Sequence, residues 1–169
     1  MADTAATPRT ATPKFVLLQR AGSVQSTLRD GEPALAATDP DYIPLQLTRI
    51  VLGGGFSSRV NLNLREEKGY TYGAGTRLSA SRAGGDLVSQ ADVRNEVTGA
   101  SLKEFFGEFD RLRNEPVPAK ELDDTKRYIA GDYVLSNQLQ GAVAGTLAKN
   151  WLIGLPSDFL GQYVPRLRQ

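Results

Sequence analysis

The sequence predicts an α+β fold, a two-layer sandwich in which helices pack on one face of a largely antiparallel sheet. Short runs of extended character, bounded by turn residues, occur near the start and in the middle of the chain, and stretches with helical apolar spacing follow them. The chain has 169 residues, of which 40% are hydrophobic and 23% are charged. This size and composition are typical of one compact domain.

Two extended segments are expected near the N-terminus. Residues 15–19 form a short apolar run that suggests a buried strand, and residues 21–23 form a turn. A second extended segment is expected over residues 24–29, ending before Asp30-Gly31. Residues 1–13 are rich in Ala, Thr and Pro and lack the apolar run of a signal peptide. We interpret them as a disordered leader, and residues 14–169 as a single domain whose C-terminal end looks truncated.

Two helices are expected next. Asp41 suits an N-cap and Pro44 suits the first turn of a helix that ends at the glycines of residues 53–55. A second helix is expected from Ser57 or Ser58 to about residue 68, followed by Gly69 as the terminating glycine. The apolar positions of the first helix, spaced i, i+4, i+7 and i+8, are Ile43, Leu47, Ile50 and Val51.

A hairpin and further helices complete the prediction. Residues 70–80 and 85–93 form two strands joined by a turn at residues 81–84. Helical spacing then recurs over residues 102–112, after Pro118, and beyond residue 140, with a short helix in the tail. The aromatic residues of these helices, namely Phe105, Phe106, Phe109 and Trp151, are expected in the core.

Composition excludes several functions. The 20 basic and 19 acidic side chains form no long run of one sign, so nucleic acid is a poor candidate ligand. No apolar run approaches the roughly 18–20 residues that span a bilayer, and we expect a soluble chain. The sequence contains no His and no Cys. A zinc site of the usual peptidase type and the Ser-His-Asp and Cys-His arrangements therefore cannot be built from it.

A glycine-rich motif is the most specific feature of the sequence. Residues 52–60 read LGGGFSSRV, and residues 64–73 read LREEKGYTYG, with Tyr72 seven residues after Arg65. This ordered combination resembles a signature of the pitrilysin/insulinase family of zinc peptidases, which includes mitochondrial processing peptidase. The resemblance extends over about residues 14–165.

The resemblance implies that the zinc site and the substrate-binding residues lie in different domains. In that family the zinc motif H-x-x-E-H lies in a different domain from the Arg/Tyr pair. The chain is therefore expected to be a substrate-binding, non-zinc-binding domain or subunit of a zinc metalloendopeptidase that degrades or processes peptides. Zinc is expected in a homologous zinc-motif-bearing partner, either in the same polypeptide or in a separate subunit. The chain alone should not cleave peptides, and the family suggests a periplasmic setting.

Arg65 and Tyr72 are the candidate substrate-binding residues that the resemblance implies. A guanidinium can donate hydrogen bonds to substrate carbonyls, and a phenol can donate a hydrogen bond to an oxyanion. Tyr70, five residues after Arg65, is the second candidate phenol. A purely structural interpretation is also open, in which Arg65 is a cation at a helix C-terminus and Tyr72 is a half-buried strand residue.

The remaining polar features have simpler interpretations. The run Gly53-Gly54-Gly55 follows a helix and lacks the Gly-Lys-Ser/Thr ending of a phosphate-binding loop, so we interpret it as a structural turn anchored by Arg59. Glu66 and Glu67 are adjacent on a helix and are expected to be solvated. The main alternative function is a noncatalytic scaffold or interaction protein that retains the peptidase fold. A hydrolase using carboxylates and another metal is a third, weaker hypothesis.

Overall fold

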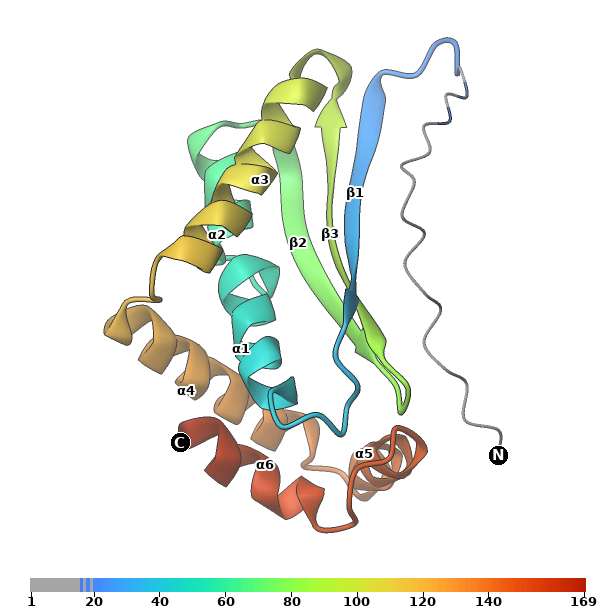
Figure 1. Ribbon diagram of the computed structural model, residues 1–169, viewed down its shortest axis with the longest axis vertical. Coiled ribbons are helices and arrows are strands. Elements are labelled where there is room, and N and C mark those ends of the chain that lie inside the picture. The colour runs from blue at the N-terminus through green and yellow to red at the C-terminus, as the bar shows by residue number, and fades with distance from the viewer. Residues whose placement is uncertain (1–15, 17, 19) are drawn as a thin grey trace.

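The computed structural model describes residues 16, 18 and 20–169. A three-stranded antiparallel sheet with order β1-β3-β2 is built from β1 (Gln25–Ala34), β2 (Thr71–Ala80) and β3 (Gly85–Arg94). Figure 1 shows helices α1 (Tyr42–Gly53), α2 (Arg59–Asn61) and α3 (Thr98–Asn114) on one side of this sheet. The α+β prediction with helices on one face is therefore confirmed.

Three more helices extend the helical layer beyond the sheet. Helix α4 (Ala119–Ser136), helix α5 (Gln140–Leu152) and helix α6 (Phe159–Arg168) gather at the end of the molecule where the β2–β3 hairpin lies (Figure 1). The chain also contains a π-helix, η1 (Leu62–Glu67), and a short 3-10 turn, η2 (Asn95–Val97). No helix among the described residues is long and apolar enough to cross a membrane.

The core consists of three clusters. The largest lies between the sheet and α2, η1 and α3, and its buried members include Val60, Leu64, Val93 and Phe105. A second cluster joins α1, α4 and α6. A third, smaller cluster brings Ile153 against the segment before α1. The sheet cluster fixes the segment from residue 53 to residue 74, which carries the glycine turn and the candidate site.

One strand boundary departs from the sequence prediction. Asp30-Gly31 was expected to end an extended segment, but β1 continues without a break and pairs with β3 from Gln25↔Arg94 to Ala34↔Gly85. Gly31 lies opposite Val88 in this ladder. Ten residues of continuous pairing outweigh the local turn preference of Asp-Gly, which acts only on neighbouring residues.

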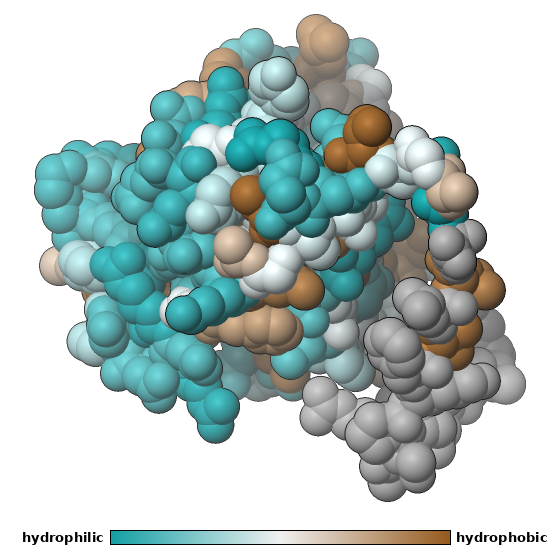
Figure 2. All heavy atoms as spheres, turned by 90° about the horizontal axis from the view of Figure 1, so that it is seen from above, coloured by the Kyte–Doolittle hydropathy of each residue, from teal (hydrophilic) through white to brown (hydrophobic). Residues whose placement is uncertain are grey.

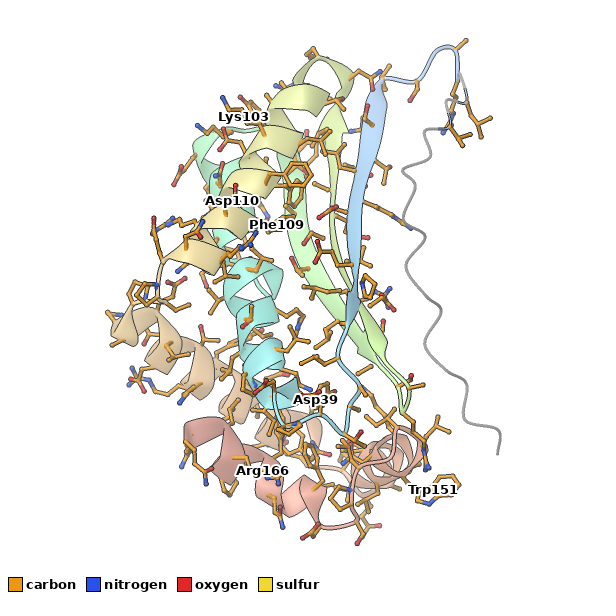
Figure 3. All side chains as sticks on the ribbon, viewed as in Figure 1. Asp39, Lys103, Phe109, Asp110, Trp151 and Arg166 are labelled. Atoms are coloured by element: carbon orange, nitrogen blue, oxygen red, sulfur yellow. The ribbon has the colours of Figure 1, made fainter. Side chains whose placement is uncertain are left out.

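The expected core position of two aromatic residues is wrong. Phe105 is buried and Phe109 packs against the sheet cluster, but Phe106 is 52% exposed and Trp151 is 72% exposed. Trp151 points away from α5 at the edge of the molecule, whereas Phe109 points from α3 towards the sheet (Figure 3). Helical spacing identified a stripe of apolar residues on α5, but no described element packs on the outer part of that stripe.

The other helices and the hairpin follow the sequence prediction. The π-helix replaces the second half of the helix expected to end near residue 68, and Gly69 follows it in a left-handed conformation (φ 63°). The expected leader at residues 1–13 lies outside the described residues, as do residues 15, 17 and 19 of the buried strand expected at residues 15–19. At the two described positions that expectation is wrong, because Val16 and Leu18 lie in no strand and are 62% and 87% exposed. Figure 2 shows that the end of the molecule seen from above is mainly hydrophilic, with apolar residues in small separate groups.

Candidate functional site

Arg65 and Tyr72 lie on either side of one tight connection. Arg65 is in η1 and Tyr72 is the second residue of β2. The N–H of Lys68 donates to the carbonyl of Asn63 (3.0 Å), which is the wide hydrogen-bond spacing of a π-helix. Gly69 then reverses the chain. This turn places the end of the helix next to the start of the strand.

The guanidinium of Arg65 lies over the ring of Phe56. The Arg65 Cζ atom is 4.7 Å from the ring centroid, and Arg65 Nε also lies 3.1 Å from a carboxylate oxygen of Glu66. The Arg65 side chain remains 41% exposed. An aromatic face attracts a cation and limits its movement without using its N–H donors. Most donors of Arg65 therefore stay available to a ligand.

Tyr72 projects from a bulge in β2. The register passes from Thr71↔Val93 to Ala74↔Ala91, so β2 contains one residue more than β3 across this interval. The Thr71 hydroxyl donates to the Asp92 carbonyl (2.7 Å), which holds the bulge in place. Tyr72 is 92% exposed, and its hydroxyl has no hydrogen-bond partner among the described residues. The bulge directs this phenol into solvent.

Tyr70, the second candidate phenol, lies in a different environment. It is half-buried and packs against the sheet cluster of the core, while its backbone N–H donates to Leu64. Of the two phenols, Tyr72 is therefore the one that a large ligand can reach. No hydrogen bond joins Arg65 to Tyr72 within the described part of the chain, and both keep free donors.

The glycine run forms a tight turn at the end of α1. A Cβ atom on Gly53 would collide with the backbone nitrogen and the hydroxyl of Thr76, so only glycine allows this approach of α1 to β2. Ser58 closes the turn by donating its hydroxyl hydrogen to the Gly55 carbonyl (2.6 Å). The glycines thus act as packing and turn residues in this fold.

Arg59 connects the turn to α4. Its guanidinium makes two hydrogen bonds to the carboxylate of Glu121, and the Arg59 side chain is 7% exposed. The hydrogen bond from Arg59 lowers the pKa of the Glu121 carboxyl, and the same bond raises the pKa of Arg59. This ion pair therefore holds both charges at neutral pH and fixes the start of α4 against α2.

Asn61 is a residue of the site that the sequence analysis missed. Its side-chain Nδ2 donates to the Phe56 carbonyl (2.7 Å), and its Oδ1 accepts from the Ala74 N–H (3.1 Å). Asn61 is 4% exposed. The residue therefore ties the loop that supports Arg65 to the strand that carries Tyr72. The sequence did carry one sign of this role, because Asn61 is a polar residue between Val60 and Leu64 on the buried face of a helix.

Two hollows border this surface. One has a volume of about 690 Å³ and is lined by the glycine turn, by Phe56 and Leu62, and by residues of α4 such as Glu121 and Tyr128. The other, of about 430 Å³, lies on the strands beside Gly73. Phe56, which lies against Arg65, lines the first hollow, and Gly73, the residue after Tyr72, lines the second, whereas Arg65 and Tyr72 themselves line neither.

The described residues do not suit a zinc ion. No group of three or more His, Cys, Asp or Glu side chains in the described ranges is arranged to hold a metal. The whole chain lacks His and Cys, which are the usual nitrogen and sulfur ligands of zinc. The chemistry available at this surface is therefore hydrogen bonding from a guanidinium and a phenol.

Comparisons with known proteins identify the family that this chain resembles. The family model described as peptidase M16 inactive domain matches residues 5–129. A curated relative from Helicobacter pylori, described as the non-peptidase homolog YmxG, is 28% identical over 123 residues, covering 70% of this chain and 28% of the relative.

Solved structures give the same result. The peptidase M16 inactive domain from Pseudomonas fluorescens matches with a TM-score of 0.79 and 30% identity, over 87% of this chain and 35% of that chain. The inactive peptidase domain of a putative zinc protease from Bordetella parapertussis matches with a TM-score of 0.75 and 19% identity, over 91% of this chain and 83% of that chain. The chain spans about a third of the length of the first relatives that it matches.

Proposed function

This chain belongs to the family of peptidase M16 inactive domains, and we propose that it is the substrate-binding, non-zinc-binding part of a zinc metalloendopeptidase that degrades or processes peptides. The observation that carries the proposal is the exposure of two donors on one connection. Arg65 is supported by Phe56 and partly exposed, and Tyr72 is presented by a bulge and almost fully exposed.

The two side chains have complementary abilities. Arg65 has several N–H donors in a fixed plane, which suits the carbonyl oxygens of an extended peptide. Tyr72 supplies one O–H donor, whose hydrogen bond to a carbonyl oxygen would strengthen as negative charge develops on that oxygen. Neither group is a nucleophile or a proton acceptor near neutral pH, so the proposed role is to bind and orient the peptide.

The metal in this proposal belongs to another domain. A homologous zinc-motif-bearing domain or subunit would hold zinc, which activates water in peptidases of this kind. The present chain would contribute only substrate contacts. The periplasm is the proposed compartment, on the strength of the family resemblance, and fractionation of cells that express the full-length protein tests it.

A noncatalytic scaffold is the second candidate function. The Helicobacter pylori relative is described as a non-peptidase homolog, which favours this alternative. The contact between Arg65 and Glu66 also fits a structural arginine. In this case Arg65 and Tyr72 would be surface residues, and peptide hydrolysis would not depend on them in any assembly.

The deciding experiment is hydrolysis of an internally quenched fluorescent peptide. The chain, its zinc-motif-bearing partner domain and their mixture are each assayed with added zinc and with a chelator. The proposal expects hydrolysis that requires both components and disappears with the chelator. It also expects loss of that hydrolysis when the mixture contains the Arg65→Ala, Tyr72→Phe double variant. Equal hydrolysis by the wild-type and double-variant mixtures would favour the scaffold function.

A further inference from the structure

A separate cavity with unpaired polar groups lies at the opposite end of β2 from Tyr72. It is lined by α1, β2, the second half of α4, α5 and α6, it opens to solvent, and its volume is about 420 Å³. Leu78 of β2 lines it, six residues after Tyr72, which corresponds to about 20 Å along an extended strand. The cavity is therefore separate from the Arg65 and Tyr72 surface.

Arg49 is a half-buried cation in the wall of this cavity. It makes no hydrogen bond and no ion pair with any of the described residues, although a guanidinium has five N–H donors. Burial lowers the pKa of Arg49. Asp132 is the carboxylate in the cavity wall, but it is exposed and makes no ion pair with Arg49. An incompletely solvated cation without an acceptor is unfavourable, so an anionic ligand at this point would be stabilised.

Two asparagines in the same wall have unpaired groups. Asn150 is 8% exposed, and its Nδ2 is buried without a hydrogen-bond partner in the described ranges. Asn137 donates its Nδ2 to the Tyr133 carbonyl (2.8 Å), which leaves its buried Oδ1 without a donor. The wall therefore offers donors from Arg49, and from Asn150 if its amide turns towards the cavity, whereas the Asn137 Oδ1 is covered by protein. A native fold leaves few buried polar groups unpaired, which makes this grouping informative.

Apolar and aromatic residues form the rest of the wall together with polar ones. Ile153, Phe159 and Tyr163 are buried residues that line the cavity, and Tyr163 uses its hydroxyl to donate to Gln46. Lys149 and Arg77 add two further cations to the wall, of which Arg77 is paired with Asp86. The cavity thus has a largely polar surface, an apolar part formed by residues such as Ile153 and Phe159, and more cations than carboxylates. Its volume of a few hundred Å³ suits a small organic ligand.

We propose that this cavity binds the C-terminal carboxylate of a peptide whose last residue is apolar. Arg49 and Asn150 donate hydrogen bonds to the carboxylate, and a turn about the last torsion of Asn150 presents its Nδ2 to the ligand. Ile153 and Phe159 contact the side chain of the terminal residue. This function goes beyond the proposed peptide contacts of Arg65 and Tyr72 and does not depend on them.

The test uses the 169-residue chain and N-acetyl-phenylalanine, which has the carboxylate, the amide N–H and the apolar side chain. N-acetyl-phenylalanine amide is the uncharged control ligand. We expect the acid to shift NMR resonances of residues around the cavity, and to bind about tenfold more tightly than the amide because it alone makes charge-assisted hydrogen bonds. Equal affinities for the acid and the amide would overturn the proposal.

Variants of the cavity wall make the test specific. Arg49→Gln should weaken binding of the acid about tenfold, whereas Arg113→Gln, which removes an exposed cation of α3, should leave the affinity unchanged. Asn150→Leu removes the unpaired donor, so it should preserve or raise the unfolding temperature while weakening binding. A merely structural role of Asn150 would leave the affinity intact, and unaltered binding by both cavity variants contradicts the site.

Simple anions test whether the cavity recognises a peptide C-terminus or any small anion. Acetate and inorganic phosphate are titrated at matched ionic strength, with the same resonances followed. We expect both to bind more weakly than N-acetyl-phenylalanine, because they cannot contact the apolar residues of the wall. If either binds as tightly as the acid, the cavity is a general anion site and the peptide-terminus assignment fails.

Discussion

The guanidinium of Arg59 grips the carboxylate of Glu121 with two parallel hydrogen bonds, Nε to Oε1 at 2.9 Å and Nη2 to Oε2 at 2.7 Å. Arg59 is a buried residue of α2, and Glu121 lies in the first turn of α4, where the helix dipole also favours a negative charge. The pair joins α2 to α4, and β2 and β3 lie between these two helices in the sequence. The free energy of this ion pair therefore contributes to the packing of α4 against the glycine turn.

The first prediction concerns acid stability. The pKa of Glu121 is lower in the folded chain than in the unfolded chain, chiefly because of the hydrogen bond from Arg59. Its contribution is therefore complete above the unfolded pKa of about 4.5 and is lost as pH falls through the folded pKa. Urea unfolding between pH 7 and pH 3 should show a weaker pH dependence for Glu121→Gln than for the wild type.

The same variant should lose stability at neutral pH. Glu121→Gln leaves the buried charge of Arg59 with a weaker partner, and we expect a loss of about 1–3 kcal/mol at pH 7. Glu67→Gln, which changes an exposed carboxylate on η1, is the matched control and should behave like the wild type. Parallel pH profiles for the wild type and Glu121→Gln would contradict the prediction.

The second prediction concerns the two candidate substrate residues. In the zinc metalloendopeptidase that we propose, Arg65→Ala and Tyr72→Phe should each lower kcat by a factor on the order of 10², the loss typical of removing one donor to a developing oxyanion. Zinc content, measured by atomic absorption, should not change. Tyr70→Phe is the control, because Tyr70 packs in the core cluster. If Tyr70→Phe lowers turnover and Tyr72→Phe does not, the functional phenol is Tyr70 and the assignment of Tyr72 is wrong.

The third prediction concerns Asn61. Asn61→Ala would leave the Phe56 carbonyl and the Ala74 N–H without their partner, at a cost of roughly 2–4 kcal/mol in unfolding free energy. Asn61→Asp retains the acceptor for Ala74 but places a carboxylate in a buried site beside the Phe56 carbonyl, so its loss at pH 7 should be at least as large. Chemical unfolding monitored by circular dichroism measures both. A loss for Asn61→Ala within the error of the wild type would show that these two bonds do not stabilise the loop.

The fourth prediction compares two glycines of the same turn. Gly53→Ala places a methyl group against the backbone of Thr76, and we expect a loss of about 1–3 kcal/mol or more. Gly55→Ala meets no atom within 4 Å and should change stability by less than about 1 kcal/mol. Thermal unfolding of the two variants side by side gives the comparison. Similar melting temperatures for the two variants would argue against the tight approach of α1 to β2.

The fold could be predicted well where local signals and pairing agree. The β2–β3 hairpin has a polar, glycine-containing turn between two extended segments, and α1 has a proline in its first turn and ends at glycine, so each element is specified by its own residues. Asp30-Gly31 shows the opposite case. Its turn preference is local, but β1 is held by a partner strand more than fifty residues away.

The candidate site could be predicted only in part. The spacing of Arg65 and Tyr72 is visible in the sequence, and the Gly69 turn that relates them is local. The support of Arg65 by Phe56, the bulge under Tyr72 and the bridge made by Asn61 each depend on three-dimensional contacts. The cavity around Arg49 combines residues of α1, α4, α5 and α6, so no single stretch of sequence reveals it.

The exposed position of Trp151 determines what fluorescence can measure in this protein. It is the only tryptophan in the chain, its ring faces solvent, and the Arg82 guanidinium lies 6.0 Å from its centre. Arg82 also donates to the backbone carbonyls of Trp151 and Leu152. The native emission should therefore resemble that of a hydrated indole and change little on unfolding. A partner that covers the end of α5 would instead shift the emission to shorter wavelength, so this residue is a natural reporter of association.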